Sequence, residues 1–355
     1  MAAYGDAIQR VVRPGDIVVD LGAGTGILGY QACRAGAARV YAVECGDIVD
    51  LVPQFAADNG LSDRIVVQKG LSFDVQLPEQ ADVIIASMLD AFGIDNNLLA
   101  IVRDANQRLL KPGGVIIPQS LRMSYCPVEV PEWYQANIDC WSLAHLGFSL
   151  RAARARAVNQ LSGGKITERD LLAAPQAFDE IVLSEVSVPK AASAGTFQIE
   201  RSGVLHAVAG WFRATMTEGI FCSNSPLDPA PVPWSLALLP IEQPTAVVAG
   251  ERLEIAIRSD DTIWSWDVRL YGLDGVLKAE FHHSTFFGQF LEGLRKYGSG
   301  AVPTLSEPEQ AKLAALELCD GKRSMAEIAE AVVLRFPQRF KTASEALAFA
   351  GGVLR

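Results

Sequence analysis

The sequence lacks several features that mark whole classes of protein. Its six cysteines are dispersed over 355 residues, at Cys33, Cys45, Cys126, Cys140, Cys222 and Cys319. Zinc sites and redox motifs use closely spaced cysteines, so we expect reduced thiols and no metal site. No uninterrupted apolar run reaches the roughly 18 residues of a membrane span. The first residues also lack a basic stretch followed by an apolar core. We therefore expect a cytoplasmic protein without a membrane partner.

Positive charge is also scarce in this sequence. Lys and Arg total 31 against 41 Asp and Glu, which gives a formal net charge of -10. Nucleic acids are bound by surfaces rich in lysine and arginine, so a nucleic-acid partner is not expected. A peptide or a small-molecule substrate fits this composition better. Half of the residues are apolar, and the length exceeds that of one hydrophobic core, so we expect several domains.

The first third of the chain alternates short apolar runs with amphipathic segments. This rhythm predicts an α/β domain over residues 1–120, with a doubly wound, mostly parallel, Rossmann-like sheet. The expected strands are 17–21, 40–43, 65–67, 83–86 and 115–117. The segment Lys111-Pro-Gly-Gly114 is expected to turn the chain from a helix into the last strand.

The pattern changes beyond residue 120. Period-two segments at 178–188, 206–217, 253–257 and 268–270 predict an antiparallel β-barrel over residues 121–298. Residues 138–172 read as helical, and we interpret Arg151, Arg154 and Arg156 there as a solvated face. Residues 303–355 predict a small domain of three helices, near 306–319, 324–335 and 344–353. Capping boxes at Ser306 and Ser324 begin the first two.

The most specific motif is a glycine-rich turn after the first expected strand. The strand carries Asp20, and the turn and following helix carry Gly22-Ala23-Gly24-Thr25-Gly26 and then Leu28. Dinucleotide-binding turns space their glycines as GxGxxG, because the pyrophosphate sits on the helix N-terminus. Here the spacing is GxGxG, and a carboxylate precedes it that would repel a phosphate and attract an ammonium group. The motif favours S-adenosylmethionine over NAD as the cofactor.

Two further segments are expected to complete the cofactor site. Glu44 ends the second strand, where an acidic side chain can accept both ribose hydroxyls, and Cys45 follows it. The segment Gly70-Leu71-Ser72 ends the third strand and would flank the adenine. A purely structural glycine turn is the alternative, but Glu44 and the strand order make it the weaker one.

The chain resembles the protein arginine methyltransferase family over about residues 1–285. The resemblance rests on five stretches: residues 4–8, 21–28, 35–44, 58–65 and 109–114, and in the second half on Ala209-Gly-Trp-Phe212 and Pro231-Val-Pro-Trp234. It implies a cofactor domain followed by a β-barrel, with a helical arm near residues 133–172 that mediates head-to-tail dimerisation. A homodimer is therefore expected, with Trp133, Tyr134, Trp141, Leu143, Leu146 and Phe148 burying an apolar face against the partner.

The sequence departs from this family at the substrate pocket. The resemblance implies two loop glutamates that hold the substrate guanidinium, but Ser87 and Asn96 stand at these positions. The histidine of the family's Thr-His-Trp turn is absent from Val232-Pro-Trp234. A family arginine that touches the cofactor would fall one position before Met1. Ser87 remains a candidate cofactor contact. A desolvated arginine without carboxylate partners is costly, so we expect a non-arginine acceptor.

Three residues are the remaining candidates for proton transfer. Asp90 and Asp95 lie in the same loop as the missing glutamates, although solvated loop carboxylates are the alternative. His206 lies on an expected barrel strand, where a core role is the alternative. Trp264 and Trp266 would either line the acceptor pocket or pack in the barrel.

The C-terminal segment resembles small winged-helix modules that bind leader peptides in ribosomal-peptide and pyrroloquinoline quinone biosynthesis. This resemblance suggests a peptide or a secondary metabolite of a natural-product pathway as the acceptor. Residues 301–355 contain seven basic and seven acidic side chains, so DNA binding is not favoured. A catalytically inactive scaffold subunit that binds cofactor or partner is the main alternative, and a true protein arginine methyltransferase is a lesser one.

Overall fold

The structure is a computed structural model that describes residues 1–355 except 146, 261, 290–304, 341 and 354–355. The chain divides into two compact units, Met1–Leu291 and Glu292–Arg355. In the described part of the chain, no helix combines the length and the apolar character needed to cross a bilayer.

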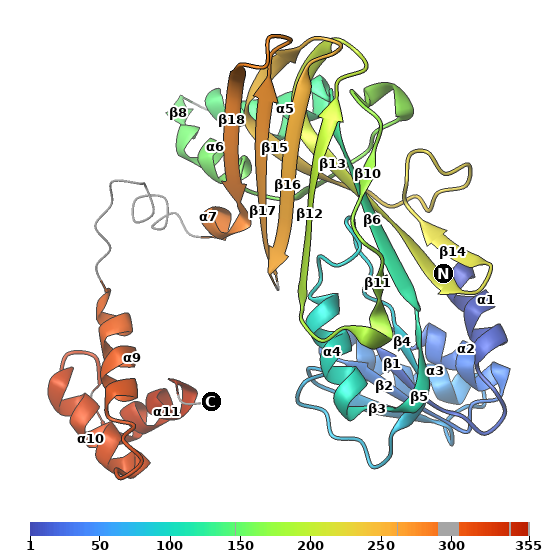
Figure 1. Cartoon of the computed structure of the whole chain (residues 1–355). Coiled ribbons are helices and arrows are strands. Elements are labelled where there is room, and N and C mark those ends of the chain that lie inside the picture. The colour runs from blue at the N-terminus through green and yellow to red at the C-terminus, as the bar shows by residue number, and fades with distance from the viewer. Residues whose placement is uncertain (146, 261, 290–304, 341, 354–355) are drawn as a thin grey trace. The chain divides into compact units, whose positions relative to one another are not determined.

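The first unit begins with a five-stranded parallel sheet in the order β3-β2-β1-β4-β5. The five predicted strands are all present, as β1 (Ile17–Leu21), β2 (Arg39–Glu44), β3 (Ile65–Lys69), β4 (Ala81–Ala86) and β5 (Leu110–Ile117). The doubly wound fold is therefore confirmed. Its helices are α1 (Ala2–Val11), α2 (Ile27–Ala35), α3 (Val52–Asp58) and α4 (Leu98–Arg108), with η1 (Asp47–Leu51) before α3. Figure 1 shows α4 on one face of the sheet and α2 with α3 on the other.

One predicted turn is part of a strand instead. Helix α4 ends at Arg108, and β5 begins at Leu110, so Lys111-Pro-Gly-Gly114 lies inside β5. The Lys111 ammonium contacts both carboxylate oxygens of Asp82, at 2.8 and 2.9 Å. The same carboxylate accepts a hydrogen bond from the Ile17 N–H. These contacts link the segment to β4 and β1, which local glycine and proline signals do not reveal.

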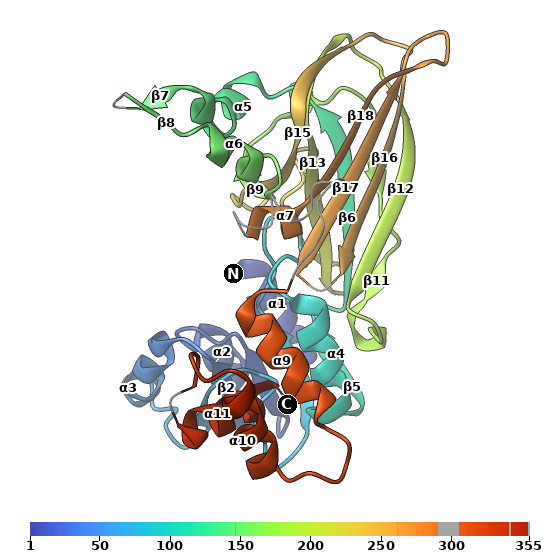
Figure 2. The same ribbon diagram turned by 90° about the vertical axis from the view of Figure 1, so that its left-hand side faces the viewer.

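The second half of this unit consists of two antiparallel sheets that form the predicted barrel-like layer. The larger sheet runs β10-β6-β13-β15-β9, with β11 and β14 attached, and the smaller one runs β12-β16-β17-β18. Figure 2 shows the two sheets as facing layers. The strands are β6 (Ser120–Val128), β9 (Ser162–Gly164), β10 (Gln176–Ala177), β11 (Ile181–Val182), β12 (Lys190–Gln198), β13 (Gly203–Thr217), β14 (Ile220–Ser223), β15 (Leu236–Val247), β16 (Arg252–Asp260), β17 (Ile263–Tyr271) and β18 (Leu277–Ser284). The expectation of a strand over 178–188 was wrong, because only β11 and the short helix η4 (Leu183–Glu185) form there.

The aromatic side chain of Phe92 helps to join the parallel sheet to the antiparallel layer. Phe92 follows β4, is fully buried and stacks on Trp264 with ring centroids 4.9 Å apart. It also meets the edge of Phe178 at 5.8 Å. Gly210 on β13 makes this possible, since a Cβ there would lie 2.5 Å from the Phe92 ring. The loop that carries Phe92 is thereby fixed against the barrel.

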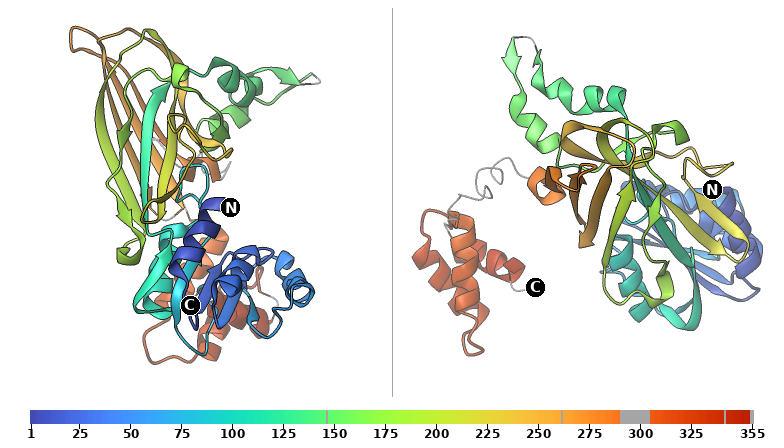
Figure 3. Two further views of the ribbon diagram at one scale, coloured as in Figure 1. Left: turned by 90° about the vertical axis from the view of Figure 1, so that its right-hand side faces the viewer. Right: turned by 45° about the horizontal axis from the view of Figure 1, so that its top comes forward.

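The predicted arm is less helical than expected. It contains α5 (Pro131–Asn137), η2 (Asp139–Ser142), a hairpin of β7 (Ala144–His145) and β8 (Phe148–Ser149), α6 (Arg151–Ala157) and η3 (Glu168–Asp170). The hairpin projects away from the two sheets (Figure 3). Tyr134 packs inward, and its hydroxyl donates to the Ile241 carbonyl at 2.8 Å. By contrast, Leu143 is 61% exposed and Phe148 is 70% exposed. Leu146 lies outside the described residues.

A short helix α7 (Thr285–Gln289) ends the described part of the first unit. The second unit contains α9 (Glu307–Glu317), α10 (Met325–Arg335) and α11 (Ala343–Val353), close to the three predicted helices. Both expected capping boxes are present, at Ser306 and Ser324. Its small core is made by residues from all three helices and the segment before α11, among them Ala311, Ile328, Val332, Phe340, Ala346 and Ala350. Within the described residues of this unit, the winged-helix resemblance therefore concerns helices alone.

Candidate active site

The glycine-rich turn joins β1 to α2 at the carboxyl edge of the parallel sheet. Gly22, Gly24 and Gly26 have φ angles of 70°, 52° and 78°, which side chains rarely tolerate. The N–H groups of Gly22 and Ala23 both donate to the Val43 carbonyl, at 3.0 and 3.1 Å. Because these donors are used to join β1 to β2, they are not free to cradle a pyrophosphate. The geometry agrees with the prediction from the glycine spacing.

Glu44 ends β2 beside this turn. One of its carboxylate oxygens accepts from the Gly24 N–H at 3.1 Å, and the other accepts from the Gly46 N–H at 2.8 Å. Partial burial acts to raise the pKa of Glu44, but the N–H groups of Gly46 and Gly24 outweigh it and hold that pKa below its usual value. An ionised carboxylate with unused lone pairs therefore stands at the edge of the turn, able to accept hydroxyl groups.

Asp20 lies beneath the same turn and is fully buried. Its Oδ2 accepts from the Gly29 N–H at 3.0 Å, whereas Oδ1 has no partner in the described part of the chain. Burial raises the pKa of Asp20 to about 7, the Gly29 N–H opposes this rise, and the charge of Glu44 adds to it. A positively charged group bound at the turn would stabilise the ionised form.

A groove of about 260 Å³ opens next to these carboxylates. It is lined by Leu21, Gly22, Val43, Glu44, Cys45, Gly70, Leu71, Ser72, Phe73, Met88, Asn97 and Ile101. One wall is the segment after β3, which Arg108 anchors by donating to the carbonyls of Ser72 and Val75 at 2.8 and 2.9 Å. Arg108 itself is paired with Asp104 one helical turn earlier. The apolar walls suit a planar aromatic ring, and Glu44 suits a ribose.

Only some of the predicted cofactor residues line the groove. Gly22, Glu44, Cys45, Gly70, Leu71 and Ser72 line the groove. Gly24 and Gly26 shape the turn, Thr25 is exposed on it, and Ala23 and Leu28 are buried in the core. Ser87 follows β4, and its N–H donates to the Leu21 carbonyl at 3.3 Å. Sequence reasoning missed Leu21, Val43, Phe73, Met88, Asn97 and Ile101, which are apolar or amide side chains without a recognisable spacing.

The loop between β4 and α4 contributes to two sites. Met88 and Asn97 line the groove, whereas Asp90, Ala91 and Asp95 line a second cavity of about 600 Å³. The loop is held from the barrel side by Asn224, which is buried and donates to the Ala91 carbonyl at 2.8 Å. This single loop therefore supplies lining residues to both the groove and the cavity.

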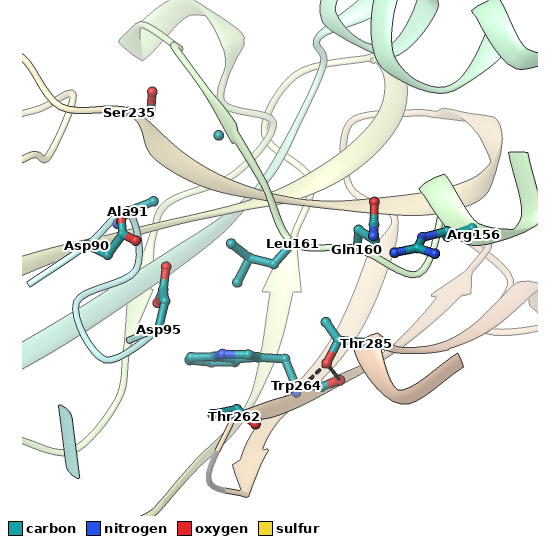
Figure 4. A pocket seen from close by; sticks show the side chains of 11 residues that line it. Asp90, Ala91, Asp95, Arg156, Gln160, Leu161, Ser235, Thr262, Trp264 and Thr285 are labelled. Atoms are coloured by element: carbon teal, nitrogen blue, oxygen red, sulfur yellow. Dashed lines mark hydrogen bonds between the residues drawn. The ribbon is translucent and has the colours of Figure 1, made fainter. Parts of the chain in front are cut away.

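Figure 4 shows how the cavity residues are arranged. Asp90 and Asp95 lie on one side, Arg156 and Gln160 on the other, and Leu161 and Trp264 between them. The remaining lining residues are Gly163, Ser235, Thr262 and Thr285. The cavity thus brings both predicted loop carboxylates together with a tryptophan that the sequence left open between two roles. Trp266 is buried instead, and its Nε1 donates to the Pro240 carbonyl at 2.9 Å.

The two carboxylates of the cavity have different surroundings. Asp90 is exposed and accepts from the Ala91 N–H at 2.8 Å and the Asn96 side chain at 3.0 Å. Asp95 accepts from the Phe92 N–H at 2.9 Å, and its buried Oδ1 has no partner in the described residues. Burial raises the pKa of Asp95 to about 7; the Phe92 N–H opposes this rise, and the charge of Asp90 adds to it. Asp95 is therefore poised to exchange a proton near neutral pH.

His206, the third predicted proton-transfer residue, lies elsewhere. It is buried on β13, with Nδ1 3.3 Å from the Val130 N–H and 2.9 Å from the Val204 carbonyl. Its ring lies 5.5 Å from that of Tyr134, and it is not among the residues that line the cavity. Burial lowers the pKa of His206, so the ring is neutral. These contacts are those of a core residue between α5 and β13.

Two family models match consecutive parts of this chain. Residues 6–121 match the model described as ribosomal protein L11 methyltransferase (PrmA), and residues 122–274 match the arginine methyltransferase oligomerization subdomain. Among curated proteins, a probable protein arginine N-methyltransferase 6 of Arabidopsis thaliana is 31% identical over 217 residues, covering 59% of this chain and 50% of that protein. Protein arginine N-methyltransferase 1.1 of the same plant is 28% identical over 243 residues, covering 67% and 62%. The chain therefore spans between half and about three-fifths of the length of these relatives.

Solved structures show the same fold. A Trypanosoma brucei PRMT1 enzyme-prozyme heterotetrameric complex with AdoHcy has a TM-score of 0.68 at 20% identity, covering 80% of this chain and 93% of the other. Arabidopsis thaliana protein arginine methyltransferase 10, in an open conformation, has a TM-score of 0.67 at 20% identity, covering 80% and 94%. At this level of identity the likeness concerns the fold.

Proposed function

We propose that this chain, which belongs to a protein arginine methyltransferase-like family of S-adenosylmethionine-dependent methyltransferases, methylates an amine rather than an arginine side chain. The observation that carries this proposal is the β4–α4 loop, which lines the groove with Met88 and Asn97 and the cavity with Asp90 and Asp95. A methyl donor in the groove and an acceptor in the cavity would meet along this loop. Such proximity is the main requirement of an in-line displacement.

The residues of the groove fit S-adenosylmethionine. Glu44 is ionised and suits the ribose hydroxyls, the apolar walls suit adenine, and the unpartnered Oδ1 of Asp20 suits a nearby positive charge. The N–H groups of Gly22, Ala23, Gly24 and Gly26 are already used within the protein, which disfavours a dinucleotide. When bound, the cofactor supplies a methyl group on a positively charged sulfur.

The cavity is a poor site for a guanidinium group. A guanidinium keeps its proton at any physiological pH and needs ionised carboxylates on its edge. Ser87 and Asn96 are uncharged, and Asp95 is only partly ionised near neutral pH. The cation Arg156 also faces the same cavity. An amine differs, because it can give up a proton.

Asp95 is proposed as the catalytic base. The ionised carboxylate takes one proton from the substrate ammonium, which leaves a neutral amine with a free electron pair. With S-adenosylmethionine bound, that pair would form the new N–C bond while the C–S bond breaks, which would give a methylammonium product and neutral S-adenosylhomocysteine. Asp95 then releases its proton to water. General-base catalysis of this kind contributes about 10²- to 10⁴-fold.

We further propose that the chain forms a homodimer through its arm, and that the acceptor is a peptide or a secondary metabolite of a biosynthetic pathway. The match of residues 122–274 to an oligomerization subdomain supports the first part. The exposed Leu143 and Phe148 at the projecting hairpin support it as well. The resemblance of the C-terminal helices to peptide-binding modules supports the second part.

The pH dependence of amine methylation tests the role of Asp95. Asp95 must be ionised to accept a proton, and its pKa of about 7 means that it is mostly protonated at pH 6. With a substrate amine that stays almost fully protonated across the range, the wild-type rate should therefore rise as pH increases through 7 and level off above 8. The rate of Asp95→Asn depends on the small fraction of free amine, so it should be lower and should keep rising with pH.

Asp90→Asn is the matched control for this experiment. It keeps the base but removes the charge that helps to raise the pKa of Asp95, so the inflection should move to lower pH. If Asp95→Asn has the same rates as the wild type at every pH, Asp95 is not the base.

A further inference from the structure

We infer that Arg156 forms an anion-binding end of the acceptor cavity, so that the acceptor carries a carboxylate as well as the amine that is methylated. This inference rests on the proposed function for the role of the amine. It goes beyond that function because it assigns to Arg156, on α6, a contact with a carboxylate of the acceptor. The expectation of a solvated helix face holds for Arg151 and Arg156, which are exposed, but not for Arg154, which is partly buried.

The arginines of α6 have different environments. Arg154 donates to the Glu242 carbonyl at 2.7 Å and to the Tyr134 hydroxyl at 3.1 Å, and it pairs with Asp139 at 3.3 Å. It therefore holds the arm against the barrel. Arg156 lies two residues later, is exposed and lines the cavity, and no hydrogen bond or ion pair engages its guanidinium within the described residues. Its charge is available to a ligand.

The position of Arg156 is fixed by its neighbours. Ala157 and Val158 are buried against Tyr134 and Ile138. The Asn159 side chain then accepts from the Ser284 N–H at 3.0 Å, which ties the end of α6 to β18. Gln160 and Leu161 follow directly and line the cavity. A short anchored segment thus presents one charge, one amide and one apolar side chain to the same space.

The cavity is therefore polarised along its length. The carboxylates of Asp90 and Asp95 lie at one end, Leu161 and Trp264 form an apolar middle, and the Arg156 guanidinium lies at the other end (Figure 4). A ligand with an ammonium group at one end and a carboxylate at the other matches both charges. The apolar middle matches a short hydrocarbon spacer. A diamine or a simple alkylamine matches only one end.

Probes of defined length test this inference. The full chain, saturated with S-adenosylhomocysteine, is titrated calorimetrically with ω-amino acids of four, six and eight carbons and with the alkylamines of equal length. The best-fitting amino acid should bind at least about tenfold more tightly than its matched alkylamine, the scale of one charge-assisted contact. Arg156→Gln should abolish this preference without changing the affinity for S-adenosylhomocysteine.

Two further variants sharpen the test. Arg156→Glu should reverse the preference, so that a diamine of the same length binds more tightly than the amino acid. Arg151→Gln is the matched control, because Arg151 is an exposed arginine of the same helix that does not line the cavity. It should leave the preference unchanged. An amino acid preference that survives Arg156→Gln, or no carboxylate-dependent binding in the wild type, overturns the inference.

Binding and methyl transfer, measured separately, distinguish a failure of the anion site from a failure of the proposed function. If the amino acids bind with an Arg156-dependent preference but no methyl group is transferred from S-adenosylmethionine, the anion site stands and the methylation of amines fails. If alkylamines are methylated with no effect of a carboxylate, the proposed function stands and the anion site fails. A pair of peptides distinguishes a peptide acceptor from a free amino acid. One peptide carries lysine and glutamate at the best spacing, and in the other glutamine replaces the glutamate. Tighter binding of the glutamate peptide also supports the anion site.

Discussion

Asp20, Glu44 and Asp95 carry the same functional group in three different surroundings. Glu44 receives two backbone N–H groups, and these hold its pKa below the usual value. Asp20 and Asp95 each accept a hydrogen bond from one backbone N–H of another residue, and each keeps a buried oxygen without a partner in the described residues. Burial therefore raises the pKa of both to about 7. Glu44 suits a permanent hydrogen-bond acceptor, and Asp95 suits a group that exchanges protons.

Glu44 is expected to bind the ribose hydroxyls of the cofactor. Glu44→Ala should weaken binding of S-adenosylmethionine about 10- to 100-fold, because charge-assisted hydrogen bonds contribute about 1.5–3 kcal/mol. Isothermal titration calorimetry measures this change. Glu185→Ala, which removes an exposed carboxylate away from the groove, is the control. Unchanged affinity in Glu44→Ala contradicts the ribose assignment, and tight NAD binding by the wild type contradicts the assignment of the groove.

At the scale of elements, the β4–α4 loop depends on contacts from the barrel. Asn224 donates to the carbonyls of both Ala91 and Ser235, at 2.8 and 2.9 Å, and its Oδ1 accepts from the Phe212 N–H at 2.8 Å. Phe92 adds its stacking on Trp264. These contacts join the carboxylate side of the cavity to β13 and to the segment before β15.

Asn224→Ala is therefore expected to affect the acceptor cavity more than the cofactor groove, because Asn224 holds the loop at Ala91, beside Asp90. It leaves the buried Phe212 N–H without a partner, which costs about 1–3 kcal/mol of folding free energy. It should also lower the rate of methyl transfer, because Asp90 and Asp95 lose their support. Denaturation and calorimetry together measure these effects. If the affinity for S-adenosylmethionine falls as much as the rate does, Asn224 does not act on the cavity alone.

The sequence predicts some of these elements well because their signals are local. Alternating apolar runs and the GxGxG spacing place the parallel sheet, the glycine turn and Glu44. The signals fail where a contact joins distant segments. The sequence around Phe92 does not predict its contact with Trp264, and the sequence around Ala91 does not predict its contact with Asn224. The spacing of Arg154 and Arg156 does not show that Arg154 holds the arm against the barrel whereas Arg156 faces a cavity. The sequence left His206 open between proton transfer and a core role for the same reason, since its packing against Tyr134 joins distant segments.

At the scale of the whole molecule, the arm is expected to make the chain a dimer. Leu143 and Phe148 are exposed at the projecting hairpin, and burying such apolar side chains stabilises an interface. Light scattering should give a mass about twice the 38.2 kDa of one chain, and Leu143→Asp with Phe148→Asp should give the monomer. Leu273→Asp, at an equally exposed leucine in another turn, should stay dimeric. A monomeric wild type rejects the arm interface.

We propose that the chain transfers methyl groups to an amine and not to arginine. The most direct measurement is mass spectrometry of an equimolar mixture of an arginine-rich peptide and an ω-amino acid after incubation with the protein and deuterated-methyl S-adenosylmethionine. The account predicts label on the amine nitrogen and none on the guanidinium. Label on the guanidinium at the roughly 1 per second or faster that is typical of enzymes, with none on the amine, would contradict it.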